Sequence, residues 1–188
     1  MRAWKHFQTI THHRWLVMKY CFRVGLIWQG LTHDLSKYSW TEFRVGAKYW
    51  TGDKSPNMAE RRELGYSTAW MHHKGRNKHH FEYWVDYRPG TRIYTPVQMP
   101  PRYLVEMCMD RIAACRVYNG AAYTDGDALA YLDRSSEYQM MHPVTHQQLR
   151  FLLTMLRDHG EQALFAFIRQ VVLPGKPFAL EPPACQEG

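Results

Sequence analysis

Eleven histidines are unevenly distributed along this 188-residue sequence, and their spacing could support metal chemistry. Eight of them lie within residues 1–80, where three His-His pairs occur. Imidazole and carboxylate groups are ligands suited to zinc, iron, manganese and nickel. A metal site needs several such groups that converge from different elements. The side chains that could serve are, in order, His13, His33, Asp34, His73, His79, His80 and Asp110.

Each of these residues also has a simpler explanation when it is considered alone. A single His13 is more often an ordinary surface or core histidine than a ligand. The pair His33-Asp34 could be the polar end of a helix. The pair His79-His80 could lie in a solvated loop beside the basic residues of 74–78, as part of a phosphate or nucleic-acid patch. The order of the candidates and their spread over several helices therefore support the metal hypothesis.

Asp110 is the most informative carboxylate because it lies in an apolar helical segment, YLVEMCMDRIAACRVY. An aspartate that faces an apolar core is costly unless it is paired or bound to a metal. The alternative is an ion pair with Arg111 or Arg116 at the edge of the apolar stripe. The sequence alone favours neither interpretation.

The two later His-His pairs leave one ligand undecided. His72 and His79 are seven residues apart, as are His73 and His80, so either set could share one face of an unbroken helix. Gly and Asn within 75–78 favour a loop instead, which would let the second pair turn independently. We favour His73 over His72.

Helices must position most of these residues. Apolar residues at helical spacing, with Gly and Pro near the ends, predict helices over about residues 9–24, 26–35, 40–52, 56–73, 102–118, 145–158 and 161–172. Residues 84–101 hold four prolines and are expected to form a loop or a short hairpin. The fold class is therefore all-α. We expect one domain over residues 1–173 and a Pro-rich tail over 174–188.

The start of the helix near residue 40 has two polar residues with more than one possible role. Ser39 and Glu42 have the spacing of a capping box, in which each side chain accepts a backbone N–H from the other. Glu42 could also orient a ligand histidine by accepting its second N–H.

Composition and charge exclude several classes of protein. Aromatic residues make up 14% and hydrophobic residues 45% of the chain, so an intrinsically disordered protein is not expected. The formal net charge of +7 favours a small anionic, phosphorylated partner; nucleic acid is possible but not favoured, because the basic residues are dispersed. Four cysteines without a CxxC pair suggest a reduced, cytoplasmic protein. Lys19 and Arg23 interrupt the apolar segment 15–28, so no membrane span is expected.

The order of these residues resembles the HD-domain metal-dependent phosphohydrolase superfamily. There, a histidine on one helix is followed by a His-Asp pair on the next and by a lone aspartate on a later helix. Three stretches support the resemblance: HRWLV at 13–17, HDLSK at 33–37 and MDRIAACRVY at 109–118. The resemblance covers about residues 10–120 and implies an HD-domain-like helical bundle. The chain is also similar to a small uncharacterised bacterial and phage family, which offers no function.

Superfamily members with two metals, such as the HD-GYP phosphodiesterases, insert a further histidine and a His-His pair before the final aspartate. The stretch HHKGRNKHH at 72–80 supplies both in that order, although within one short segment rather than on separate helices. The GYP signature is absent, so hydrolysis of cyclic-di-GMP is not implied.

The resemblance implies two ligand sets that share one aspartate. The first metal would be bound by His13, His33, Asp34 and Asp110. The second metal would be bridged by Asp34 and held by His73, His79 and His80. The implied cofactor is one or two divalent transition metal ions per chain, which could be Fe, Mn, Zn, Co or Ni.

The activity that the resemblance implies is hydrolysis of a nucleotide or another small phosphoester through a metal-activated water. Asp34 and Lys37 would be catalytic, and Lys37 and Arg76 would contact the phosphate. One alternative is a di-iron HD-domain oxygenase, because the same ligand order occurs in superfamily members that activate oxygen. Another is a non-enzymatic basic binding module with a structural metal.

Overall fold

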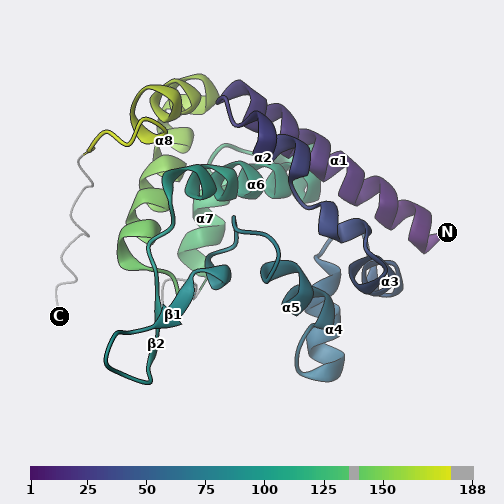
Figure 1. The fold of residues 1–188 in the computed structure, drawn as a ribbon. Coiled ribbons are helices and arrows are strands. Elements are labelled where there is room, and N and C mark those ends of the chain that lie inside the picture. The colour runs from purple at the N-terminus through teal and green to yellow at the C-terminus, as the bar shows by residue number, and fades with distance from the viewer. Residues whose placement is uncertain (136–139, 179–188) are drawn as a thin grey trace.

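The computed structural model describes residues 1–135 and 140–178, which fold into helices with one small hairpin (Figure 1). The helices are α1 (Arg2–Arg23), α2 (Ile27–Thr32), α3 (Trp40–Tyr49), α4 (Pro56–Leu64), α5 (Thr68–Lys74), α6 (Pro101–Asn119), α7 (Asp127–Arg134) and α8 (Pro143–Phe167). The strands β1 (Val85–Tyr87) and β2 (Tyr94–Pro96) pair antiparallel. The expected all-α fold with a short hairpin is therefore confirmed.

Helix α1 contributes to the core and to the site with a single face. Its buried residues are His6, Ile10, His13, Val17, Tyr20 and Cys21. Spacings of three and four place them in one stripe along the helix. The C-terminal half of the stripe packs into the apolar core, whereas the N-terminal half presents two imidazoles to a cavity. The core therefore fixes the position of these histidines.

Helix α6 passes through the middle of the molecule, against α1, α7 and α8 (Figure 1). Its residues 104–109 and 112–113 are all buried, so the helix is covered on most sides. Each large apolar side chain buried in this way contributes about 1.5–3 kcal/mol. The acidic residues of α6 are Glu106 and Asp110. Both lie in the site described below rather than among apolar side chains.

The segment 56–73, expected as one helix, forms two. Gly65 ends α4 with a left-handed φ of 82°, a conformation that glycine adopts without strain. The buried carboxylate of Glu60 then accepts hydrogen bonds from the hydroxyls of Ser67 and Thr68, each at 2.6 Å. These bonds fix the corner and start α5 in a new direction.

The C-terminal helices agree with the expected break at Gly160. Residues 145–158 and 161–172 were expected as two helices, and the backbone of α8 is interrupted at Gly160, whose φ of 78° and ψ of 176° are not helical. The second helix ends in a π-helical turn, Ile168–Val172. Most of the Pro-rich tail expected at 174–188 lies outside the described residues.

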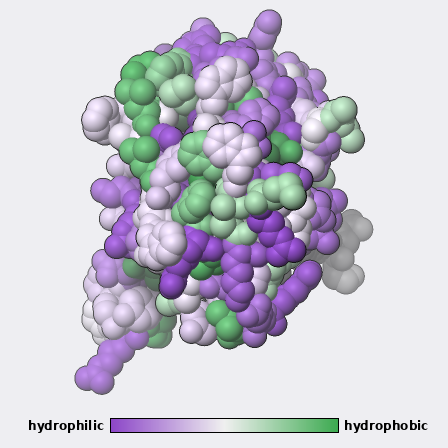
Figure 2. All heavy atoms as spheres, turned by 90° about the vertical axis from the view of Figure 1, so that its right-hand side faces the viewer, coloured by the Kyte–Doolittle hydropathy of each residue, from purple (hydrophilic) through white to green (hydrophobic). Residues whose placement is uncertain are grey.

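Hydrophilic and hydrophobic side chains are intermixed on the surface, as the face in Figure 2 shows. Large exposed side chains include Trp4, Trp28 and Trp40. In the part of the chain that the structure describes, no helix has the length and apolar character needed to cross a bilayer.

Candidate metal centre

The pair His33-Asp34 lies in the turn after α2, which ends earlier than the sequence predicted. Among the described residues, Asp34 is the only non-glycine residue with a positive φ (52°). Such a conformation costs about 1–3 kcal/mol and is typical of functional sites. Arg14 of α1 holds the turn, because its guanidinium donates to the carbonyl oxygens of His33 (2.6 Å) and Leu31 (3.1 Å). Asp34 is thereby buried, with 1% of its side chain exposed.

One oxygen of Asp34, Oδ2, faces the first set of predicted ligands. It lies 3.9 Å from Nε2 of His13 and 3.3 Å from Nε2 of His33. Oδ1 of Asp110 lies 2.8 Å from Nε2 of His13 and 3.4 Å from Nε2 of His33. The four donor atoms of this first cluster all lie within 4.8 Å of one another. Elements α1, α6 and the turn after α2 thus place four potential ligands together.

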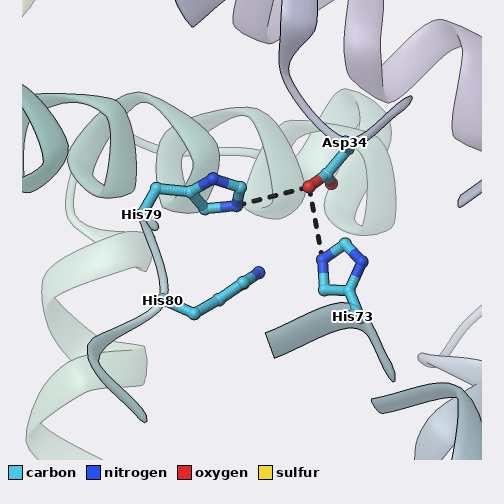
Figure 3. Close-up of side chains that lie close together, drawn as sticks. All are labelled: Asp34, His73, His79 and His80. Atoms are coloured by element: carbon cyan, nitrogen blue, oxygen red, sulfur yellow. Dashed lines mark ion pairs between the residues drawn. The ribbon is translucent and has the colours of Figure 1, made fainter. Parts of the chain in front are cut away.

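The other oxygen of Asp34, Oδ1, faces the second set. It lies 3.2 Å from Nε2 of His73 on α5 and 3.3 Å from Nε2 of His79 in the following loop. Figure 3 shows these imidazoles and that of His80 around the carboxylate. The donor atoms of this second cluster also lie within 4.8 Å of one another. The loop expected at 75–78 is present and lets the second His-His pair turn towards Asp34.

Glu106 connects the two clusters through the ring nitrogens that do not face Asp34. Its Oε1 lies 2.9 Å from Nδ1 of His33, in the first cluster, and 3.1 Å from Nδ1 of His79, in the second. These bonds hold the pKa of Glu106 below its usual value, although burial would raise it. An ionised carboxylate can only accept hydrogen bonds, so each Nδ1 donates. Once its Nε2 is deprotonated, each ring can present a lone pair to a cation beside Asp34.

Glu42 does the same for the second cluster. Its carboxylate lies 2.8 Å from Nδ1 of His73 and 2.6 Å from Nδ1 of His72. The backbone N–H of Glu42 bonds to the hydroxyl of Ser39 at 3.5 Å, which is one half of the expected capping box. The side chain is therefore used to orient imidazoles. Both rings contact Glu42 through Nδ1, but only His73 has its Nε2 beside Asp34 and belongs to the second cluster.

Six atoms at the centre are buried and have no hydrogen bond of suitable geometry among the described residues, although some lie at ion-pair distance from one another or, for Oδ2 of Asp34, from Lys37. They are Nε2 of His13, His33, His79 and His80, and both carboxylate oxygens of Asp34. Each such atom costs about 1–3 kcal/mol when it is left unsatisfied. A cation at the centre of each cluster would satisfy these atoms. Nitrogen and oxygen donors in this combination suit a divalent transition metal, so the residues present fit the ions that the resemblance implies.

The electrostatics of the site keep its carboxylates ionised. Burial would raise the pKa of Asp34, but His33 and Lys37 hold it well below its usual range. In the same way, contacts with neighbouring imidazoles outweigh burial and hold the pKa of Asp110 well below its usual range. The pKa of His80 is well below its usual value, because of burial and the neighbouring histidines. His80 is therefore neutral and can donate a lone pair.

A cavity of about 530 Å³ opens onto both clusters. His13 and Asp110 of the first cluster and His73 and His80 of the second lie in its wall, together with Lys37. The wall also includes the aromatic side chains of Trp50, Trp70, Tyr118 and Tyr131. The volume is in the range of about 300–1,000 Å³ that is usual for sites of small molecules.

The two predicted phosphate contacts lie in different environments. Lys37 is in the cavity wall, and its Nζ lies 2.6 Å from Oδ2 of Asp34. Arg76 is exposed, donates to the carbonyl oxygen of His72 at 3.3 Å and is not among the residues that line the cavity. It follows the end of α5, where the chain runs along the surface. The structure therefore does not bring Arg76 to the clusters.

Two residues of the site were not expected from the sequence. Glu106 lies four residues, or about one helical turn, before Asp110. Two acidic residues at this spacing in an apolar helix are a signal that could have identified it. Arg14 gave no such signal, because its role depends on the position of the turn after α2. Of the two arginines proposed as alternative partners of Asp110, Arg116 instead pairs with Glu161 at 2.7 Å.

The fold and the site together define an all-α protein with two adjoining clusters of buried histidines and carboxylates. Residues 2–155 match a family of unknown function, DUF5662, and the chain belongs to that family. No curated protein matches the chain. No solved structure matches it either. The matched range includes every residue of both clusters.

Proposed function

We propose that this protein is a metal-dependent phosphohydrolase that acts on a small phosphoester such as a nucleotide. The observation that carries the proposal is the shared aspartate, because each oxygen of Asp34 faces one cluster of buried donors. The residues that would hold the ions are His13, His33, Asp34 and Asp110 for the first and Asp34, His73, His79 and His80 for the second.

The roles of the protein's own groups follow from their contacts. A bound divalent ion would lower the pKa of a water molecule and offset charge on the phosphoryl group. Glu106 and Glu42 orient the imidazoles whose Nε2 atoms face Asp34. Burial would lower the pKa of Lys37, but Asp34 and Asp110 hold it above its usual value. From the cavity wall, Lys37 can donate a hydrogen bond to a phosphoryl oxygen.

The test begins with protein purified without a nickel column. Elemental analysis should find one or two transition metal ions per chain, directly or after reconstitution with Mn, Fe and Zn. The loaded protein should hydrolyse at least one member of a panel of nucleotides and generic phosphodiesters, and EDTA should abolish the turnover. Less than about a tenth of an equivalent of metal after reconstitution would contradict the ligand assignment.

The same experiment distinguishes the other two functions that the ligand types allow. Oxygen consumption by the iron form, without phosphoester turnover for any metal, would favour a di-iron oxygenase. Metal that is bound but supports neither reaction would favour a binding module in which the ion is structural.

A further inference from the structure

His6 is a histidine of the cavity that belongs to neither cluster. It lies on α1 seven residues before His13, on the same buried stripe, and lines the same cavity. His6 is 6% exposed, and its Nδ1 is buried without a hydrogen-bond partner in the described part of the chain. Burial and the ammonium of Lys37 lower the pKa of His6 to about 4, so the ring is neutral at pH 7.

Gly46 of α3 makes room for this ring. A Cβ atom added at Gly46 would overlap Nε2 and Cε1 of His6, so any larger residue there would displace the imidazole. The ring of Phe43 packs against His6 at a centroid distance of 5.4 Å. His6 and Gly46 both line the cavity, and Nε2 is the nitrogen of the His6 ring that lies against Gly46.

A purely structural role explains this arrangement poorly. A buried polar atom without a partner costs about 1–3 kcal/mol, and a phenylalanine would fill the same space without that cost. The imidazole is therefore held in place by Gly46 and Phe43, and in the described part of the chain its Nδ1 does not support the fold through a hydrogen bond.

We propose that His6 is a substrate-binding residue, whose neutral imidazole donates a hydrogen bond from Nε2 to an anionic oxygen of the phosphoryl group beside Lys37. This inference rests on the proposed phosphohydrolase function. The neutral ring adds a donor to the cavity without adding charge. Lys37 supplies the positive charge, and His6 would supply a second, directional contact.

The test uses metal-loaded full-length protein and inorganic phosphate as the probe. His6→Phe keeps the shape of the ring and removes its nitrogens, whereas His6→Gln keeps an amide donor near the position of Nε2. Gly46→Ala displaces the ring while His6 itself is unchanged. His12→Phe is the matched control, because His12 is exposed on the same helix.

We expect His6→Phe to retain its metal content and to melt at the same or a higher temperature than the wild type. Its phosphate binding should weaken about 10- to 100-fold, as for a lost hydrogen bond to a charged group. The KM of a phosphoester should rise by a similar factor. His6→Gln should recover part of the loss, Gly46→Ala should reproduce it, and His12→Phe should bind phosphate as the wild type does.

Two results would overturn the inference and leave the proposed function intact. In one, His6→Phe binds phosphate as tightly as the wild type. In the other, His6→Phe lowers the melting temperature and the metal content together, as a structural residue would. If the metal-loaded wild-type protein neither binds phosphate nor hydrolyses a phosphoester, the proposed function fails and the role of His6 fails with it.

Discussion

Replacing Glu106 tests whether one carboxylate orients a ligand in each cluster. The same oxygen, Oε1, accepts from Nδ1 of His33 and from Nδ1 of His79. In Glu106→Gln the amide oxygen can occupy that position, so both hydrogen bonds can be kept and only the charge is lost. We therefore expect metal affinity to fall about tenfold, at the lower end of the range for groups that support ligand histidines.

Glu106→Leu removes the acceptor as well as the charge. Two buried imidazole N–H groups then have no acceptor, at a cost of about 1–3 kcal/mol each. The free energy of unfolding should fall by about 2–5 kcal/mol, partly offset by the apolar side chain. Metal affinity should fall about a hundredfold or more, because both rings lose the contact that directs Nε2 towards Asp34.

The assay is competition for metal with a chromophoric chelator, combined with thermal and chemical unfolding of the metal-free protein. Glu63→Gln is the matched control, because Glu63 is exposed on α4 and pairs with Lys48. This control should change neither quantity. If Glu106→Leu binds metal as tightly as Glu63→Gln does, Glu106 does not orient the ligands and the two clusters are not connected through it.

Three further outcomes are expected. Asp34→Ala should remove both ions and all activity, since its two oxygens face different clusters; full metal occupancy by elemental analysis would contradict this. Asp110→Asn should weaken the first site but leave the helical circular dichroism spectrum unchanged, and an unchanged metal affinity would refute the assignment. Metal affinity should fall as the pH is lowered. Burial lowers the pKa values of His33, His73 and His79, but neighbouring carboxylates outweigh burial and raise them. Protons therefore compete with the metal for these ligands. Affinity measured from pH 8 to pH 6 should fall up to about tenfold per pH unit for each proton displaced, and a flat profile would count against ligation by these rings.

The predicted ligand sets came from the resemblance to the HD-domain superfamily, and helix periodicity supports the positions of some of these residues because it reflects local geometry. Val17 and Cys21 mark the buried stripe of α1, and the same period places His13 on it. A charge in an apolar helix needs a partner, so Asp110 was noticed as a candidate, although the helix alone left an arginine partner equally open. In both cases the evidence lies within one helix, where spacing alone determines which side chains share a face.

The parts that could not be predicted depend on contacts between distant segments. His72 and His73 are equivalent by local spacing, and only the direction of α5, set by the corner at Glu60, places His73 rather than its neighbour beside Asp34. Arg76 is close in sequence to both His-His pairs, yet the loop turns it to the surface. A glycine can be tolerated inside a helix or can end one, so the periodic pattern alone did not predict that the helix breaks at Gly65.

The charge of the centre bears on how many ions it would hold. The site brings together the carboxylates of Asp34, Asp110, Glu42 and Glu106, with Lys37 as the cation in direct contact with Asp34. When the histidines are neutral, these five groups carry a net charge of −3. One divalent ion would leave the centre negative, and the cavity would then repel a phosphate. Two divalent ions would make the net charge positive by one unit, and the cavity would attract an anionic substrate. The carboxylates around the clusters therefore favour two ions over one for a phosphohydrolase.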